Sequence, residues 1–60
     1  MKPKATEVIE ACLKAERTGS QAHRNKADQL LDEYVEQRVE EGYEEKRVRA
    51  AIKAHVTRRL

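Results

Sequence analysis

Apolar residues recur every three or four positions in three separate stretches of this chain, which is the spacing that gathers side chains on one face of an α-helix. The first stretch predicts a helix over residues 5–17, with Thr6 as its N-cap and Gly19 ending it. The apolar face of this helix consists of Ala5, Val8, Ile9, Cys12, Leu13 and Ala15.

The second stretch predicts the longest helix, over residues 20–41. Ser20 suits its N-cap, and Gly42 stands where a left-handed residue ends a helix. We expect Tyr43 to fold back over that end, and the stem of Arg38 to pack while its guanidinium reaches water. The apolar face runs through His23, Ala27, Leu30, Leu31, Tyr34, Val35 and Arg38.

The third stretch predicts a helix over residues 44–59. No segment alternates with period two, and the only proline is Pro3, so the pattern predicts no strand. The chain is therefore expected to be one all-α domain, a small three-helix bundle over residues 1–60. The short turn before the third helix contains a glycine, as the joint of a helix-turn-helix does. The apolar face of the third helix consists of Val48, Ala51, Ile52, His55 and Val56.

Length and composition limit the core and the compartment. Sixty residues without Phe or Trp build only a thin core, so we expect a homo-oligomer, most simply a dimer, or stabilisation by a partner. The single cysteine, Cys12, forms no internal disulfide, which favours a reducing compartment. The start MKPKATEV lacks an apolar run, and no stretch approaches the roughly 20 apolar residues of a membrane span. The sequence thus predicts a cytoplasmic protein without a membrane partner.

Charge is abundant but nearly balanced. Lys and Arg number 13 and Asp and Glu 11, for a net charge of +2, so the total argues for no class of partner. Its distribution along the chain is uneven, because residues 20–42 sum to −3 and residues 43–60 to +4.

The basic residues of the third helix fall on the side away from Val48 and Ile52, around small residues that let a helix approach a surface closely. Arg and Lys on such a helix reach phosphates and guanine edges in a major groove, and the free N–H groups at the start of the second helix suit a phosphate. Our first hypothesis is therefore a small DNA-binding regulator of transcription that reads with its third helix. The predicted nucleic-acid contacts are Ser20, Arg24, Lys26, Lys46, Arg47, Arg49, Lys53, Thr57 and Arg58.

An acidic ridge on the second helix supports a different hypothesis. Like charges four residues apart cost a few tenths of a kcal/mol per pair, so local stability does not explain it. A helical adaptor or inhibitor could use this ridge, together with the basic third helix, to bind another protein. A solvated face that keeps a small protein soluble also accounts for it. The ridge consists of Asp28, Asp32, Glu33, Glu36 and Glu40.

No motif predicts catalysis, a cofactor or a metal site. The chain has no HxxxH or CxxC spacing, and Cys12 stands among apolar neighbours, where a small buried residue is the simpler interpretation. His23 and His55 are expected to pack rather than to ligate. The segment 18–20 lacks the glycines and lysine of a phosphate loop, and a short helical domain offers little concavity for acid–base chemistry. We therefore expect no enzyme.

Overall fold

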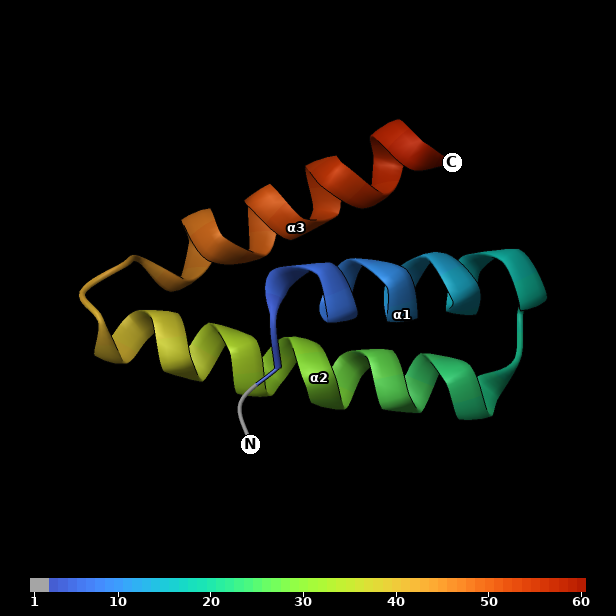
Figure 1. Ribbon diagram of the computed structural model, residues 1–60, viewed down its shortest axis with the longest axis horizontal. Helices are drawn as coiled ribbons and strands as arrows, with labels where there is room; N and C mark the ends of the chain where they lie inside the picture. The colour runs from blue at the N-terminus through green and yellow to red at the C-terminus, as the bar shows by residue number, and fades with distance from the viewer. Residues whose placement is uncertain (1–2) are drawn as a thin grey trace.

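The computed structural model describes residues 3–60, so the first two residues of the predicted domain lie outside the described part. Three helices form: α1 (Ala5–Thr18), α2 (Gln21–Glu40) and α3 (Glu45–Arg59). Figure 1 shows α1 and α2 as an antiparallel hairpin, with α3 running back across it in the same general direction as α1. Between residues 3 and 60 there is no strand. The predicted small all-α three-helix bundle is confirmed, and each helix boundary falls within one residue of its prediction.

The core forms where the apolar faces of the three helices meet. It is almost entirely aliphatic, since the one buried aromatic ring belongs to Tyr34. Val8 is fully buried, and burying each side chain of this size contributes about 1.5–3 kcal/mol. The remaining members are Ile9 and Leu13 on α1, Val35 on α2, and Val48, Ile52 and Val56 on α3.

The turn between α2 and α3 ends α2 in the way its sequence predicts. Gly42 has φ 102°, its N–H donates to the carbonyl of Val39 at 3.0 Å, and the N–H of Tyr43 donates to the carbonyl of Arg38 at 3.1 Å. These two bonds define a Schellman motif, in which a left-handed glycine reverses the chain. The ring of Tyr43 lies 5.7 Å from the Arg38 guanidinium carbon, which confirms that Tyr43 folds back over the helix end.

The other helix ends match their predictions in part. Gly19 has φ 68° and ends α1 as expected. Ser20 occupies the N-cap position of α2, but its side chain makes no capping hydrogen bond, and its N–H donates to Thr18 Oγ1 at 3.2 Å. The prediction of Thr6 as the N-cap of α1 is wrong, because Lys4 holds that position. Lys4 has no capping side chain, so α1 begins without one.

α3 buries a narrower stripe than its sequence suggests. Only Val48, Ile52 and Val56, four residues apart, lie in the core, whereas Ala51 and His55 are exposed. The expectation that Ala51 and His55 pack on the inner face is therefore wrong. α3 packs against α1 and α2 through the row Val48, Ile52 and Val56. The neighbouring row, Ala51 and His55, lines an open groove. Cys12 is likewise only partly buried, at the edge of the core.

The arrangement of α2 and α3 gives no support to a helix-turn-helix. Figure 1 shows α3 leaving the turn at an acute angle and running back beside the hairpin, close to antiparallel with α2. In a helix-turn-helix the two helices cross at about 90–120° so that the second projects into a groove. Here the outward face of α3 is one side of a bundle rather than a projecting edge.

Candidate nucleic-acid interface

The bundle separates its charges between its two ends. Because α2 runs opposite to α1 and α3, the C-terminal ends of α1 and α3 lie at the same end of the molecule as the start of α2 (Figure 1). Dividing each helix near its middle gives a basic half, residues 12–30 and 53–60, with seven basic and two acidic residues. The acidic half, residues 3–11 and 31–52, has five basic and nine acidic residues. Their net charges are +5 and −4.

The bases of the basic half come from all three helices. Lys14 of α1 lines one hollow with His23 and Lys26 of α2, and a second hollow with Arg17 and Arg59. Arg17 Nη2 donates to the carbonyl oxygen of Arg59 at 3.5 Å, which joins the C-terminal turns of α1 and α3. A basic surface thus passes from α2 over α1 to α3, interrupted by Glu7 and Glu10 of α1. The seven exposed or half-exposed bases are Lys14, Arg17, Arg24, Lys26, Lys53, Arg58 and Arg59.

Helix dipoles explain this pattern in two helices but not in the third. α1 and α3 carry an acid in the first turn and bases in the last, the polarity that the dipole favours. α2 has no acid in its first turn and carries Arg24 and Lys26 near its start, whereas its last turn holds both Arg38 and Glu40. The charges near the start of α2 therefore oppose its dipole, and those in its last turn offset one another. Arg24 and Lys26 agree instead with the separation of charge across the whole bundle.

Six of the nine predicted nucleic-acid contacts fall in the basic half and three in the acidic half. The three outliers are Lys46, Arg47 and Arg49, which occupy the first turns of α3. The structure therefore does not place the predicted set on one surface. Those brought together in the basic half are Ser20, Arg24, Lys26, Lys53, Thr57 and Arg58.

Arg49 is not an open cationic contact as predicted. Its Nη2 lies 3.0 Å from Asp32 Oδ1 of α2, and its Nε lies 3.1 Å from Glu45 Oε2. These hydrogen bonds, that with Asp32 first, raise the pKa of Arg49. Asp32 of the acidic ridge thus meets this edge of α3, so Arg49 links the two helices and its charge is already compensated.

Two further predicted contacts have weaker partners. Arg24 lies 3.5 Å from Glu16, and Arg47 lies 3.2 Å from Glu44, with 86% of the Arg47 side chain exposed. Exposed pairs of this kind are worth about 0–1 kcal/mol, so either arginine can exchange its carboxylate for a phosphate. The predicted bases with no carboxylate within 4.0 Å, among residues 3–60, are Lys26, Lys46, Lys53 and Arg58.

The predicted protein-binding ridge lies mostly at the opposite end. Asp28 belongs to the basic half, whereas Asp32, Glu33, Glu36 and Glu40 belong to the acidic half. All five are exposed, and Asp32 is engaged with Arg49. Four of the five ridge residues therefore lie outside the basic half.

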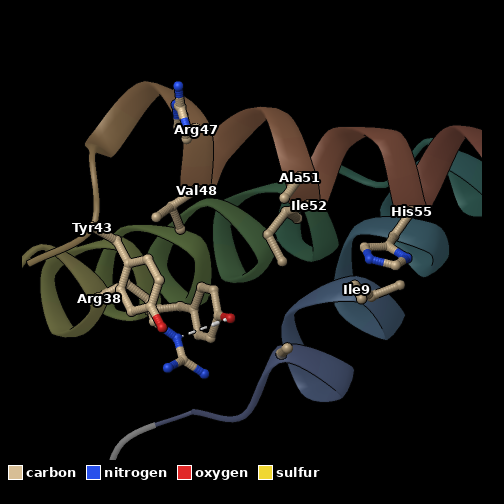
Figure 2. Close-up of a pocket in the computed structure, with 10 residues that line it drawn as sticks. Ile9, Arg38, Tyr43, Arg47, Val48, Ala51, Ile52 and His55 are labelled. Carbon is tan, nitrogen blue, oxygen red and sulfur yellow. Dashed lines mark hydrogen bonds between the residues drawn. The ribbon is translucent and has the colours of Figure 1, made fainter. Parts of the chain in front are cut away.

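A groove of about 350 Å³ opens between the start of α1, the end of α2 and α3 (Figure 2). Ile9, Val48 and Ile52 are among the apolar residues that line it, and Figure 2 places the exposed His55 ring beside Ile9 at the end away from Tyr43. No carboxylate lines this groove, and no nucleophile is paired with a base in it. It offers an apolar hollow without the constellation of a catalytic site.

Arg38 closes the other end of the groove. Its guanidinium carbon lies 5.1 Å from the centre of the Tyr34 ring and 5.7 Å from that of Tyr43. Its Nε donates to Tyr34 Oη at 3.1 Å, the bond drawn as a dashed line in Figure 2. Its Nη1 donates to Glu41 Oε1 at 2.8 Å. The hydrogen bond with Tyr34, then that with Glu41, raises the pKa of Arg38. The half-buried side chain thus packs beside the two tyrosines, and its guanidinium pairs with Glu41 at the surface, in agreement with the sequence prediction.

The predicted nucleic-acid contacts do not include Lys14, Arg17 and Arg59, although the sequence groups Arg17 with Arg24 and Lys26 around the start of the second helix. Arg17 and Arg59 are 42 positions apart, and no motif joins them. These residues can be identified from the sequence by summing the charge of each half of each helix. An up–down–up order of helices then places the ends of the first and third helices beside the start of the second.

Comparisons with known proteins add no family assignment. No family model, no curated protein and no solved structure matches this chain. Within residues 3–60 no helix is long and apolar enough to cross a membrane, and no three His, Cys, Asp or Glu side chains gather as metal ligands would.

Proposed function

We propose that this protein binds nucleic acid through the phosphate backbone, using its basic half. The observation that carries the proposal is the gathering of seven bases from three helices at one end of the bundle, including bases in α2 that oppose that helix's dipole. An arrangement that costs local stability and yet concentrates positive charge is what an anion-binding surface requires.

The proposal differs from the sequence hypothesis in which part of α3 is used. α3 contributes its C-terminal half, with Arg58 and Thr57, rather than a full reading face from Lys46 onward. α1 and α2 contribute Lys14 and Lys26. Lys and Arg contacts with phosphate position a protein without specifying sequence, so backbone binding is the expected mode. Seven bases set an upper limit of about 6 on the slope of log affinity against log salt, at roughly 0.9 per phosphate neutralised.

Arg47 and Arg58 provide a matched test. Both are exposed arginines on α3, and they are 11 residues apart, so they project from nearly the same side of the helix three turns from each other. Arg58 lies in the basic half and Arg47 in the acidic half. If α3 contacts DNA along its whole length, both arginines contribute to binding. If the basic half is the binding surface, only Arg58 contributes. Arg47→Glu and Arg58→Glu change the net charge of the protein equally.

The measurement is fluorescence anisotropy of a labelled 20-base-pair duplex from 20 to 300 mM salt. One lost phosphate contact lowers the salt slope by about 1. Each phosphate contact raises the logarithm of the binding constant by about 0.9 when salt is diluted tenfold from 1 M. Loss of one contact should therefore weaken binding about tenfold at 0.1 M salt. We expect this from Arg58→Glu and from Lys14→Glu, and less than a twofold change from Arg47→Glu. Equal losses for Arg47→Glu and Arg58→Glu, or no binding by the wild type at 20 mM salt, would contradict the proposal.

A second candidate function uses the acidic half as a docking surface for a basic protein. The net charge of −4 favours it, as do Glu33 and Glu36, which are exposed and form no ion pair with any residue from 3 to 60. A lysine-rich model peptide should bind the wild type and the Arg58→Glu variant alike, and should lose affinity several-fold with Glu33→Lys plus Glu36→Lys. Binding that ignores the double variant removes this candidate.

A further inference from the structure

We infer, on the basis of the proposed function, that the nucleic acid held by the basic half is double-stranded, and that bases on opposite sides of α1 reach the two strands across one groove. Two features of the structure carry this step: neither tyrosine of the chain lies in the basic half, and the cations of that half lie on two separated flanks.

Stacking on aromatic rings supplies much of the affinity of single-strand binding proteins, at about 1–3 kcal/mol per base. Both tyrosines of this chain, Tyr34 and Tyr43, belong to the acidic half, where they enclose Arg38. The His23 ring is half-buried, with Nδ1 3.4 Å from Thr18 Oγ1. The His55 ring faces the groove beside Ile9 (Figure 2). Of these rings only that of His23 lines a hollow with bases of the basic half, Lys14 and Lys26, and it is half-buried.

The cations lie on two flanks of α1. On one flank, Lys14 and Lys26 line a common hollow between α1 and α2. On the other, Lys53 and Thr57 of α3 share a hollow with Glu16, two residues beyond Lys14 and therefore about 160° away around the helix. The bundle measures 24 × 15 Å across its long axis. A surface of that width can bridge a minor groove of about 6 Å or a major groove of about 12 Å and touch both backbones.

The preference for duplex can be estimated from counterion release. Each phosphate contact adds about 0.9 to the salt slope on a duplex and about 0.7 on a single strand. We take five contacts, equal to the net charge of the basic half. The salt slopes for duplex and single strand then differ by about 1, so their affinities separate by about one log unit for each tenfold dilution of salt below 1 M. Because the basic half has no tyrosine on which unpaired bases could stack and so offset this difference, the duplex is expected to bind about tenfold more tightly at 0.1 M salt.

The test compares a labelled 20-nucleotide oligothymidine, alone and paired with its complement, by anisotropy at 0.1 M salt. We expect the duplex to bind about tenfold more tightly. Equal or tighter binding of the single strand, still weakened by Arg58→Glu, would overturn this inference and leave the proposed function standing. Binding of neither probe would overturn both.

The two-flank arrangement has its own test with Lys26→Glu and Lys53→Glu. Each variant should lower the duplex salt slope by about 1, and the double variant by about 2, since the flanks contact different strands. Lys46→Glu, on the same side of α3 as Lys53 but in the acidic half, should leave the slope unchanged. A double variant no worse than either single variant, or a loss confined to one flank, would overturn the bridging of two strands.

Discussion

The start of α2 offers a test in which stability and binding are expected to move in opposite directions. Ala22 is exposed at the second position of this helix, and the first turn contains no acid. Ala22→Glu places a carboxylate where the helix dipole favours one, four residues before Lys26, while adding negative charge to the basic half. Ala22→Lys does the reverse, and Ala22→Gln provides a neutral reference of similar shape and helix propensity.

The size of the effect follows from the position. A carboxylate in the first turn contributes about 0.3–1 kcal/mol, and a Glu–Lys pair four residues apart about 0.2–0.5 kcal/mol. Relative to Ala22→Gln, Ala22→Glu should therefore stabilise the fold by about 0.5–1.5 kcal/mol. For a domain of this size that raises Tm by roughly 2–10 °C. Ala22→Lys, which opposes the dipole and repels Lys26, should lower it by a similar amount.

Thermal unfolding followed by circular dichroism at low salt gives the order of stability, and anisotropy with duplex DNA gives the order of affinity. We expect the Ala22→Glu variant to be the most stable, Ala22→Gln intermediate and Ala22→Lys the least stable. The order of affinity for duplex DNA should be the reverse. If the three variants had the same Tm, the dipole reasoning for α2 would be refuted. If Tm and affinity followed the same order, α2 would not be giving up stability for charge.

Three further predictions concern the fold and Cys12. Ile52→Ala should destabilise by about 2–5 kcal/mol in urea unfolding, since Ile52 is 4% exposed, whereas Leu60→Ala, at a residue 66% exposed, should change stability by less than about 0.5 kcal/mol. Gly42→Ala should destabilise the fold by at least about 1–2 kcal/mol, because alanine is strained in the left-handed backbone conformation at φ 102°. Crowding adds nothing to this cost, since an added Cβ meets no atom within 4 Å. An unchanged urea midpoint would count against the Schellman turn. Burial, then Asp28 and Glu16, raise the pKa of Cys12, so iodoacetamide should react more slowly with the folded than with the unfolded protein. Because the folded pKa lies above the unfolded one, wild-type stability should fall as pH rises past the unfolded thiol pKa, and Cys12→Ala should remove that loss.

Much of the fold could be predicted from sequence because the helix signals are local. The apolar spacing and the positive-φ glycines Gly19 and Gly42 place all three helices to within one residue. The burial of α3 was harder to predict, since Ala51 and His55 share the helical face of Ile52 by spacing. Which of them packs depends on the angle at which α3 crosses the hairpin, and that angle is set by contacts between helices rather than within one.

The candidate site was only half predictable for the same reason. Charges summed along the chain single out residues 43–60, but Arg49 lies against Asp32 of another helix, and Arg17 meets Arg59 from the far end of the sequence. The sequence hypothesis groups side chains by helix face and therefore treats α3 as one basic surface. The structure groups the bases by helix end, and that grouping depends on the direction in which each helix runs in the bundle, which only the fold gives.

The most direct test of the central claim is an NMR titration of ¹⁵N-labelled protein with a 20-base-pair duplex at low salt. We expect amide shifts to change at residues 12–30 and 53–60 as duplex is added, to return as salt is raised, and to change little at residues 31–52. Shifts concentrated at residues 44–50, or spread evenly over both halves, would contradict binding by the basic half.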